Sequence, residues 1–298
     1  MTTRNLGRDK LPWSEDRWRF IDQAVHDEAA RTRIGRRFMP IVPLADVLTA
    51  PADTIVRNAG VLTVPEAMVT PLVELWVEFS LTKQQVEAED DLATTVTLAT
   101  RAANLLAQGE DLLIFQGNGA IENAELFLRQ VLKVRAGPPG PGLADPDALE
   151  KDQVIVVPPT SGNDRFGENT FTSVSQAYAL LQQKGHYGPY TLVLPTVPYA
   201  DTFAPLTSTL IMPADRIRPL VEDRLFGTGT LEAHTGVLAS LGGNTLDFVV
   251  GRDATTAFVQ EDSEGLYRFR VFERFALRDK ARSSRILLKF LKNPEGLE

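Results

Sequence analysis

Histidine is the first candidate for acid–base or metal chemistry, and the chain has three, His26, His186 and His234. They are far apart, and none forms the HxxxH or HExxH spacing that places two imidazoles on one helix face to bind zinc. The chain has no cysteine, which excludes disulfides, thiolate catalysis, zinc fingers and iron–sulfur ligation. A solvated or hydrogen-bonded role is therefore the favoured interpretation of each histidine.

Glycine spacing gives one candidate for nucleotide binding. The chain has no G-x-S-x-G nucleophile elbow and no G-x-x-x-x-G-K-[ST] phosphate-binding loop. Gly227, Thr228 and Gly229 match the start of the G-x-G-x-x-G dinucleotide motif. However, Glu232 stands where the third glycine is required, and a predicted helix rather than a strand precedes the motif. We interpret this segment as a tight loop of small residues.

Clustered carboxylates are the remaining candidates for chemistry. Residues 87–91 contain four acids, which could bind a divalent cation or form a solvated helix face. Glu74 and Glu78 project from one face of a predicted strand, an arrangement that suits acid–base catalysis or a row of salt bridges at an interface. The solvated face and the row of salt bridges are the favoured interpretations, so the sequence predicts no catalytic site.

Composition limits the class of protein. With 43% hydrophobic and 23% charged residues, the chain of 298 residues has the balance of a soluble protein that buries a core. The net charge of −8 makes broad binding to nucleic acid a poor prediction, because phosphate contacts need clustered Lys and Arg. We expect no signal peptide, no membrane span and a cytoplasmic protein.

The elements that would carry these residues follow from apolar spacing. Ser14 is a suitable N-cap for a helix with an apolar stripe over residues 18–29, and Gly35 ends it. Residues 72–81 alternate as a strand does. Residues 84–108 lack glycine and proline and predict one helix about 37 Å long, ended by residues 110–117.

The rest of the chain is predicted to contain a surface loop, helices and strands. Prolines and glycines in residues 137–159 indicate an inserted surface loop. A helix over 171–185 and a short helix over 219–225 flank a buried strand at 190–194. Further strands are expected at residues 246–250, 254–259, 266–277 and 284–290. Glu273 interrupts the apolar face of the third of these strands.

Residues 48–70 form an unusual excursion. They contain Thr, Val, Asn, Gly and Pro, have no helical period and predict a long hairpin with Ile55-Val56 and Val61-Leu62 in its strands. Such a segment cannot cover its own apolar residues. Together with the long helix and the extended strands, it predicts surface that a single copy leaves exposed, which favours an assembly subunit.

Six short motifs, in their order and approximate spacing, resemble the encapsulins, bacterial and archaeal shell proteins with the fold of tailed-phage major capsid proteins. The motifs are Leu11-Pro12 with Trp18 and Ile21-Asp22, residues 35–38 (GRRF), residues 71–75 (PLVEL) with Phe79 and Leu81, residues 110–117 (EDLLIFQG), residues 188–193 (GPYTLV) and residues 286–290 (ILLKF). Each motif is weak alone, but six in order across nearly the whole chain are a specific signal.

The resemblance implies an α+β fold, the tailed-phage major capsid protein fold with a peripheral domain, an axial domain and an extended loop. Residues 1–47 would form the N-terminal helix and the start of the peripheral domain, and residues 48–70 the extended loop. Residues 71–194 would form the peripheral domain, with the long helix as its spine and an inserted loop at 136–169. The axial domain would cover 195–243, and residues 244–298 would return to the peripheral domain with the C-terminal strands.

The resemblance also implies sites. Ile55, Val56, Val61 and Leu62 would contact a neighbouring subunit through the extended loop. Gly227, Thr228, Gly229 and Thr230 would line a five-fold pore whose polar, uncharged rim passes ions and small solutes. Trp18, Ile21, Arg36, Phe38 and Ile41 would dock a short C-terminal peptide of a cargo enzyme, with Arg36 serving its polar groups. Pro40 stands shortly after the Gly-Arg pair, where the family often has an aspartate.

The implied function is that of a non-enzymatic subunit that self-assembles into an icosahedral nanocompartment of sixty copies or a small multiple. Its cargo would be a ferritin-like iron oxidase, with a role in iron storage, a peroxidase or a hemerythrin-like protein. We expect no nucleic-acid partner, no membrane and no cofactor, although flavin binds the shells of some relatives. Two alternatives remain open: a major capsid protein of a tailed phage or prophage, and a soluble cytoplasmic enzyme with an unrecognised site.

Overall fold

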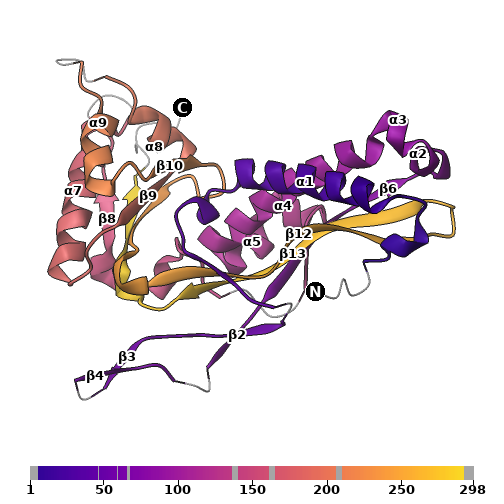
Figure 1. The fold of residues 1–298 in the computed structure, drawn as a ribbon. Helices are drawn as coiled ribbons and strands as arrows, with labels where there is room; N and C mark the ends of the chain where they lie inside the picture. Colours follow the sequence, from indigo (N-terminus) through magenta and orange to yellow (C-terminus); the bar gives the residue numbers. More distant parts are fainter. Residues whose placement is uncertain are drawn as a thin grey trace.

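The computed structural model describes residues 6–45, 47–58, 60–65, 68–135, 140–160, 165–205 and 210–291. They form two lobes and an arm (Figure 1). The larger lobe contains the N-terminal helix and the longest strands, the smaller lobe contains a second sheet, and the arm projects away from both lobes. The predicted α+β class is confirmed.

The larger lobe is built on a five-stranded sheet in the order β1–β12–β13–β6–β7. Its strands are β1 (Ile41–Pro43), β6 (Val73–Leu81), β7 (Lys133–Arg135), β12 (Leu246–Glu261) and β13 (Tyr267–Asp279). The two strands predicted at 246–250 and 254–259 form one strand, because the pairing of β12 with β13 continues across three register shifts. This long ribbon is the frame on which the other elements of the lobe pack.

Two helices pack on each other and on this sheet, namely α1 (Glu15–Thr32) and α4 (Thr94–Gln116). The predicted start of α1 is confirmed, because the Ser14 side chain accepts a hydrogen bond from the Arg17 backbone N–H at 3.2 Å. The predicted apolar stripe is also confirmed: Trp18, Ile21, Val25 and Ala29 are all buried.

The prediction of one helix over residues 84–108 is wrong. The segment forms α2 (Lys83–Glu87), α3 (Glu89–Leu92) and the start of α4, with Ala93 in the left-handed region at φ 50°. The Glu89 carboxylate accepts hydrogen bonds from the Thr95 backbone N–H and hydroxyl at 2.8 and 2.7 Å. Glu89, which lies in α3, therefore caps the N-terminus of α4. The helix then continues through the residues predicted to end it and stops at Gly117, whose φ is 58°.

The smaller lobe has its own five-stranded sheet, in the order β10–β9–β11–β14–β8. Its strands are β8 (Val154–Val157), β9 (Tyr190–Pro195), β10 (Leu225–Thr228), β11 (Thr235–Ser240) and β14 (Arg285–Phe290). The helices that accompany them are α7 (Gly167–Gln183), α8 (Thr196–Asp201) and α9 (Pro213–Ile217). Every residue of β9 is buried, which confirms the prediction of a buried strand there.

Two short helices, α5 (Asn118–Asn123) and α6 (Glu125–Leu128), follow α4.

Three features of the smaller lobe differ from prediction. Residues 154–157, predicted to lie in a surface loop, form β8, which pairs in parallel with β14; residues 136–139 and 161–164 of that predicted insertion lie outside the described residues. The helix predicted over 219–225 is displaced toward the N-terminus, because Leu225 already begins β10. The strand β11 was not predicted. The sheet therefore joins strands from residues 154–240 with one from the end of the chain.

The arm comprises residues 48–72. At its root, β2 (Thr49–Pro51) pairs with β5 (Val69–Pro71), and at its tip β3 (Val56–Asn58) pairs with β4 (Val61–Thr63). The predicted hairpin is confirmed, although Ile55 precedes β3 instead of lying in it. Each paired region is short and two-stranded, so the arm has no sheet face large enough to form a core of its own.

Candidate functional site

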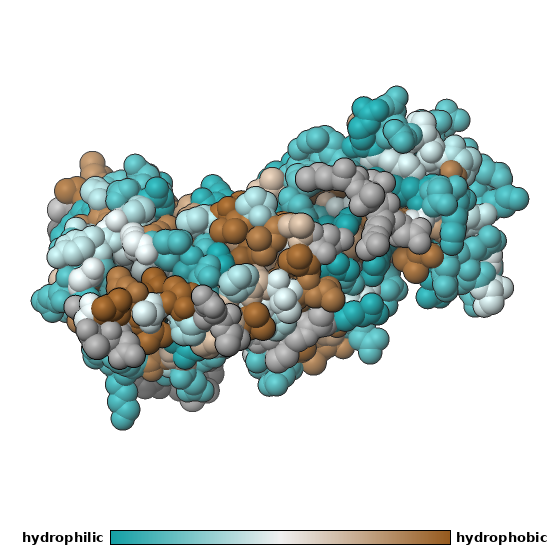
Figure 2. Space-filling model, turned by 60° about the horizontal axis from the view of Figure 1, so that its bottom comes forward, coloured by the Kyte–Doolittle hydropathy of each residue, from teal (hydrophilic) through white to brown (hydrophobic). Residues whose placement is uncertain are grey.

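The arm exposes apolar side chains along its length. Ile55, Val56, Val61 and Leu62, the predicted intersubunit contacts, are 38%, 40%, 61% and 70% exposed. Figure 2 shows the molecule with the underside of Figure 1, where the arm lies, turned forward, and apolar residues gather in patches on this face. Burying such area stabilises by about 25 cal/mol per Å². The arm is therefore a surface suited to contact with another chain, and the intersubunit role of these residues stays a prediction.

Most of the predicted cargo-docking residues lie inside the larger lobe. Trp18, Ile21 and Phe38 are buried, whereas Ile41 is 51% exposed at the edge strand β1. Arg36 is also largely buried, and its guanidinium lies 4.8 Å from the centre of the Phe248 ring. The structure thus does not gather the five side chains on one open surface, and their docking role stays a prediction.

Arg36 belongs to a buried ionic cluster made of Arg33, Arg36, Glu110, Asp253 and Glu273. Arg36 reaches Glu110 at 2.6 Å, Asp253 at 2.8 Å and Glu273 at 3.0 Å. Arg33 makes ion pairs with the same three acids. The cluster joins the segment after α1 to α4, β12 and β13. Residue spacing does not predict this cluster, and its one signal in the sequence is Glu273, which interrupts an otherwise apolar strand face.

Burial sets the protonation of the acids in and beside this cluster. Burial raises the pKa of Glu273 well above its usual range, and the charge of Glu110 raises it further. Burial, followed by the charge of Glu110, also raises the pKa of Asp111 to about 7. At the outer end of the cluster, the hydrogen bond to Asp253 raises the pKa of His26. Because Glu110, Asp253 and Glu273 are each paired with both arginines, we assign the cluster a structural role.

The predicted pore residues lie where the two lobes meet. Gly227 and Thr228 belong to β10, which pairs in parallel with β9. Together with Gly229 and Thr230, they line a hollow of about 490 Å³ that also includes residues from the ends of α1 and α4. The Gln116 side chain donates a hydrogen bond to the Thr230 carbonyl at 2.6 Å. The pore role of this segment stays a prediction.

A second hollow, of about 770 Å³, lies at the start of α1. It is lined by Leu6, Arg8, Asp9, Leu11, Trp13, Glu15, Trp18 and Arg19. The buried indole Nε1 of Trp18 has no hydrogen-bond partner, although such a group normally has one. The hollow itself offers an apolar wall and charged groups at its rim, which are features that suit an extended peptide.

Within the described residues, no helix combines the length and apolar character needed to cross a bilayer. The same part of the chain contains no group of three or more His, Asp or Glu side chains placed to hold a metal ion.

The chain is similar in sequence to known shell proteins. Residues 2–124 and 158–276 match the Linocin_M18 family, described as an encapsulating protein for peroxidase. The chain is 27% identical over 291 residues to the type 1 encapsulin shell protein EncA of Myxococcus xanthus, covering 92% of this chain and 93% of that protein.

Solved structures show the same fold at lower identity. The virus-like particle from Pyrococcus furiosus has a TM-score of 0.65 at 17% identity, over 90% of this chain and 98% of that one. A chain of Mycobacterium phage Bobi has a TM-score of 0.55 at 14% identity, over 88% and 91%. The predicted capsid fold is thereby confirmed. Since the family match spans most of the chain and a curated shell protein aligns along nearly all of it, the chain belongs to the encapsulin family of shell proteins.

Proposed function

We propose that this chain self-assembles into a closed icosahedral compartment of sixty copies, or a small multiple, that encloses a cargo enzyme in the cytoplasm. The observation that carries the proposal is the arm, whose tip is apolar and exposed in a single copy. In this proposal the arm packs on a lobe of a neighbouring copy rather than on that copy's arm. Such a contact is heterologous, and repeating it around closed symmetry axes gives a shell.

Assembly is tested on the purified chain by size-exclusion chromatography and negative-stain electron microscopy. We expect elution near the void volume and hollow round particles. Deleting residues 51–64 removes the arm tip, and we expect the shortened chain to stay folded and unassembled. A monodisperse monomer or dimer of the full chain contradicts the proposal, as do intact shells of the shortened chain.

We further propose that the cargo docks through a short C-terminal peptide in the hollow at the start of α1. Leu6 and Trp13, which line this hollow, would contact apolar side chains of the peptide. The family's description names a peroxidase as the enclosed protein, and a peroxidase, a ferritin-like iron oxidase or a hemerythrin-like protein is the expected cargo class. A compartment that stores iron would contain the iron oxidase.

Docking is best tested at the partly exposed Leu6, because removing the buried Trp18 or Phe38 also leaves a cavity in the core. The probe is a fluorescent protein that carries the C-terminal segment of a peroxidase, the enzyme that the family's description names. We expect Leu6→Ser to reduce the fluorescence that co-elutes with shells, and Leu128→Ser, at an exposed position of α6, to leave it unchanged. Equal loading of both variants would place the docking site elsewhere.

The pore assignment is tested by charge. If Gly227–Thr230 line an opening in the assembled shell, Gly229→Asp places a carboxylate ring at its rim, and we expect slower entry of anions to enclosed cargo. Gly229 is the suitable position because it is exposed, and a Cβ there meets no atom closer than 3.7 Å. Gly227 is unsuitable, since its Cβ would lie 2.3 Å from the Tyr199 ring. An unchanged rate of anion entry would contradict the assignment of residues 227–230 to a pore.

A further inference from the structure

The outgoing strand of the arm is tied to the larger lobe at its first bend. The last hydrogen bond of the root joins the Ala52 N–H to the Met68 carbonyl at 2.9 Å. Asp53 then adopts a left-handed conformation with φ 52°, which turns the chain. Two residues later, the Ile55 N–H donates to the carbonyl of Lys280, just past the end of β13, at 3.3 Å. The bend at Asp53 and the hydrogen bond from Ile55 to Lys280 therefore set the direction in which the outgoing strand leaves the lobe.

Four charged residues meet at this bend, and we call Asp53, Asp247, Arg278 and Lys280 the arm-root cluster. The Arg278 guanidinium donates from Nε and Nη2 to the two oxygens of Asp247, both at 2.7 Å. Its Nη1 donates to Asp53 and to the Pro51 carbonyl. Lys280 Nζ lies 2.6 Å from Asp247. The charges of the two acids and the two bases balance. Arg278, which is 7% exposed, joins the arm to the sheet of the larger lobe.

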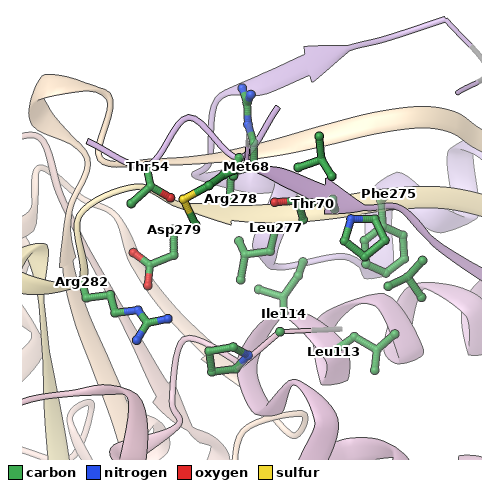
Figure 3. A pocket seen from close by; sticks show the side chains of 17 residues that line it. Thr54, Met68, Thr70, Leu113, Ile114, Phe275, Leu277, Arg278, Asp279 and Arg282 are labelled. Carbon is green, nitrogen blue, oxygen red and sulfur yellow. The ribbon is translucent and has the colours of Figure 1, made fainter. Parts of the chain in front are cut away.

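Among the described residues, apolar packing holds the arm root on one side of β13 only. The root contributes Ala50 and Leu72 to a small apolar cluster with residues of β12 and β13. On the other side of β13, a cavity of about 280 Å³ lies between the root and the end of α4. Figure 3 shows Leu277 and Asp279 directed into this cavity, and the intervening Arg278 directed away from it. Close packing therefore does not hold the arm on that side.

We propose that the ion pair between Asp53 and Arg278 preorganises the arm for the neighbouring copy. The proposal rests on the proposed function, because it assumes that the arm makes the assembly contact. A free arm would have to be ordered during association, which weakens binding, whereas a tied arm is ordered when the subunit folds. Asp53, the member of the cluster that lies on the arm, thus acts on assembly rather than on the stability of the lobes.

The test uses glycine and asparagine at residue 53. Asp53→Gly removes both the carboxylate and the restriction on φ, while Asp53→Asn removes the charge and keeps a residue type that tolerates the left-handed region. Asp223 provides the matched control, because it is an exposed aspartate with φ 62° on the smaller lobe. The control variants Asp223→Gly and Asp223→Asn make the same chemical changes away from the arm.

The measurement is the fraction of subunits in shells against total concentration, by size-exclusion chromatography with light scattering. We expect the concentration for half assembly to rise about threefold or more for Asp53→Gly, less for Asp53→Asn, and not at all for the controls. In unassembled subunits, the Ile55 amide should exchange its hydrogen faster in Asp53→Gly, while circular dichroism stays that of the parent.

The outcomes separate this inference from the proposed function. If the parent chain assembles and Asp53→Gly assembles at the same concentration, the preorganisation is refuted and the shell function stands. If the parent chain never assembles, both fall. If Asp53→Gly is unfolded, Asp53→Asn decides, and a folded Asp53→Asn with the parent's assembly threshold overturns the proposal.

Discussion

Arg33 and Arg36 face the same buried acids, Glu110 and Glu273, so each charge in the cluster has more than one partner. Their partners are distant in the sequence: Glu110 and Glu273 lie 74 and 237 positions from Arg36. Such a cluster costs desolvation and gains only if every member stays paired. At this scale, the loss of one residue leaves an uncompensated buried charge.

Replacing Arg36 with alanine should therefore be strongly destabilising. We expect the free energy of unfolding to fall by about 3–5 kcal/mol, the range for removing one partner of a buried ion pair. Urea unfolding of dissociated subunits, followed by tryptophan fluorescence, measures it. The neighbouring Arg37→Ala is the control, because Arg37 is exposed and contacts the Phe226 ring, and its loss should cost about 1 kcal/mol or less. Equal losses would show that the cluster is unimportant.

His26 gives the outer end of the cluster a pH dependence. Its pKa is raised in the folded chain by the hydrogen bond to Asp253, so the stabilisation is complete below the unfolded value of about 6.5. It is lost as pH rises through the higher folded value. Comparing parent and His26→Gln by urea unfolding between pH 5.5 and 8.5, we expect the parent's advantage to shrink as pH rises. A constant difference across this range would contradict the pair.

At the scale of elements, capping residues and apolar spacing predicted those helices and strands that depend on interactions close in the sequence. The start of α1 follows from Ser14 and the apolar period, and both were found. The break before α4 could not be predicted, because it depends on Glu89 capping Thr95 in a stretch without glycine or proline. Likewise β8 is a strand only because β14 pairs with it. Among the site residues, exposure of the arm was predictable, whereas burial of Arg36 depends on acids supplied by three other elements.

Close packing of α4 on β6 gives an element-scale prediction. A Cβ at Gly109 would lie 2.5 Å from Leu132 and 3.0 Å from Leu75. We expect Gly109→Ala to destabilise by about 1–3 kcal/mol through overpacking, although alanine favours helices by about 1 kcal/mol. Gly119→Ala, in α5 with no atom within 4 Å, should instead stabilise by about 0.4–1 kcal/mol. Thermal unfolding checks the opposite signs, and two changes of the same sign would refute the packing argument.

At the scale of the whole molecule, a single copy leaves the tip of its arm exposed, while the two lobes bury their apolar residues within the same chain. Folding and assembly are therefore separable. The lobes should be complete in an isolated subunit, and the arm should gain its apolar contacts only from another chain.

Leu62→Asp tests this separation. The side chain is 70% exposed, so the substitution should leave the circular dichroism and unfolding midpoint of the subunit unchanged. If the tip is covered in the shell, an aspartate there is buried without a partner, and assembly should be lost. Leu62→Met keeps the apolar contact and should assemble as the parent does. Size-exclusion chromatography distinguishes them, and shells formed by Leu62→Asp at parental yield would show that the tip stays in solvent.

The position of β14 between β11 and β8 has a consequence for synthesis. While a ribosome is translating the chain, β8 and β11 are made before β14, the strand that joins them. The smaller lobe is therefore completed only once β14 has emerged, and a chain terminated before residue 285 lacks a central strand of that sheet. Incomplete products would be excluded from the container by their own inability to finish folding.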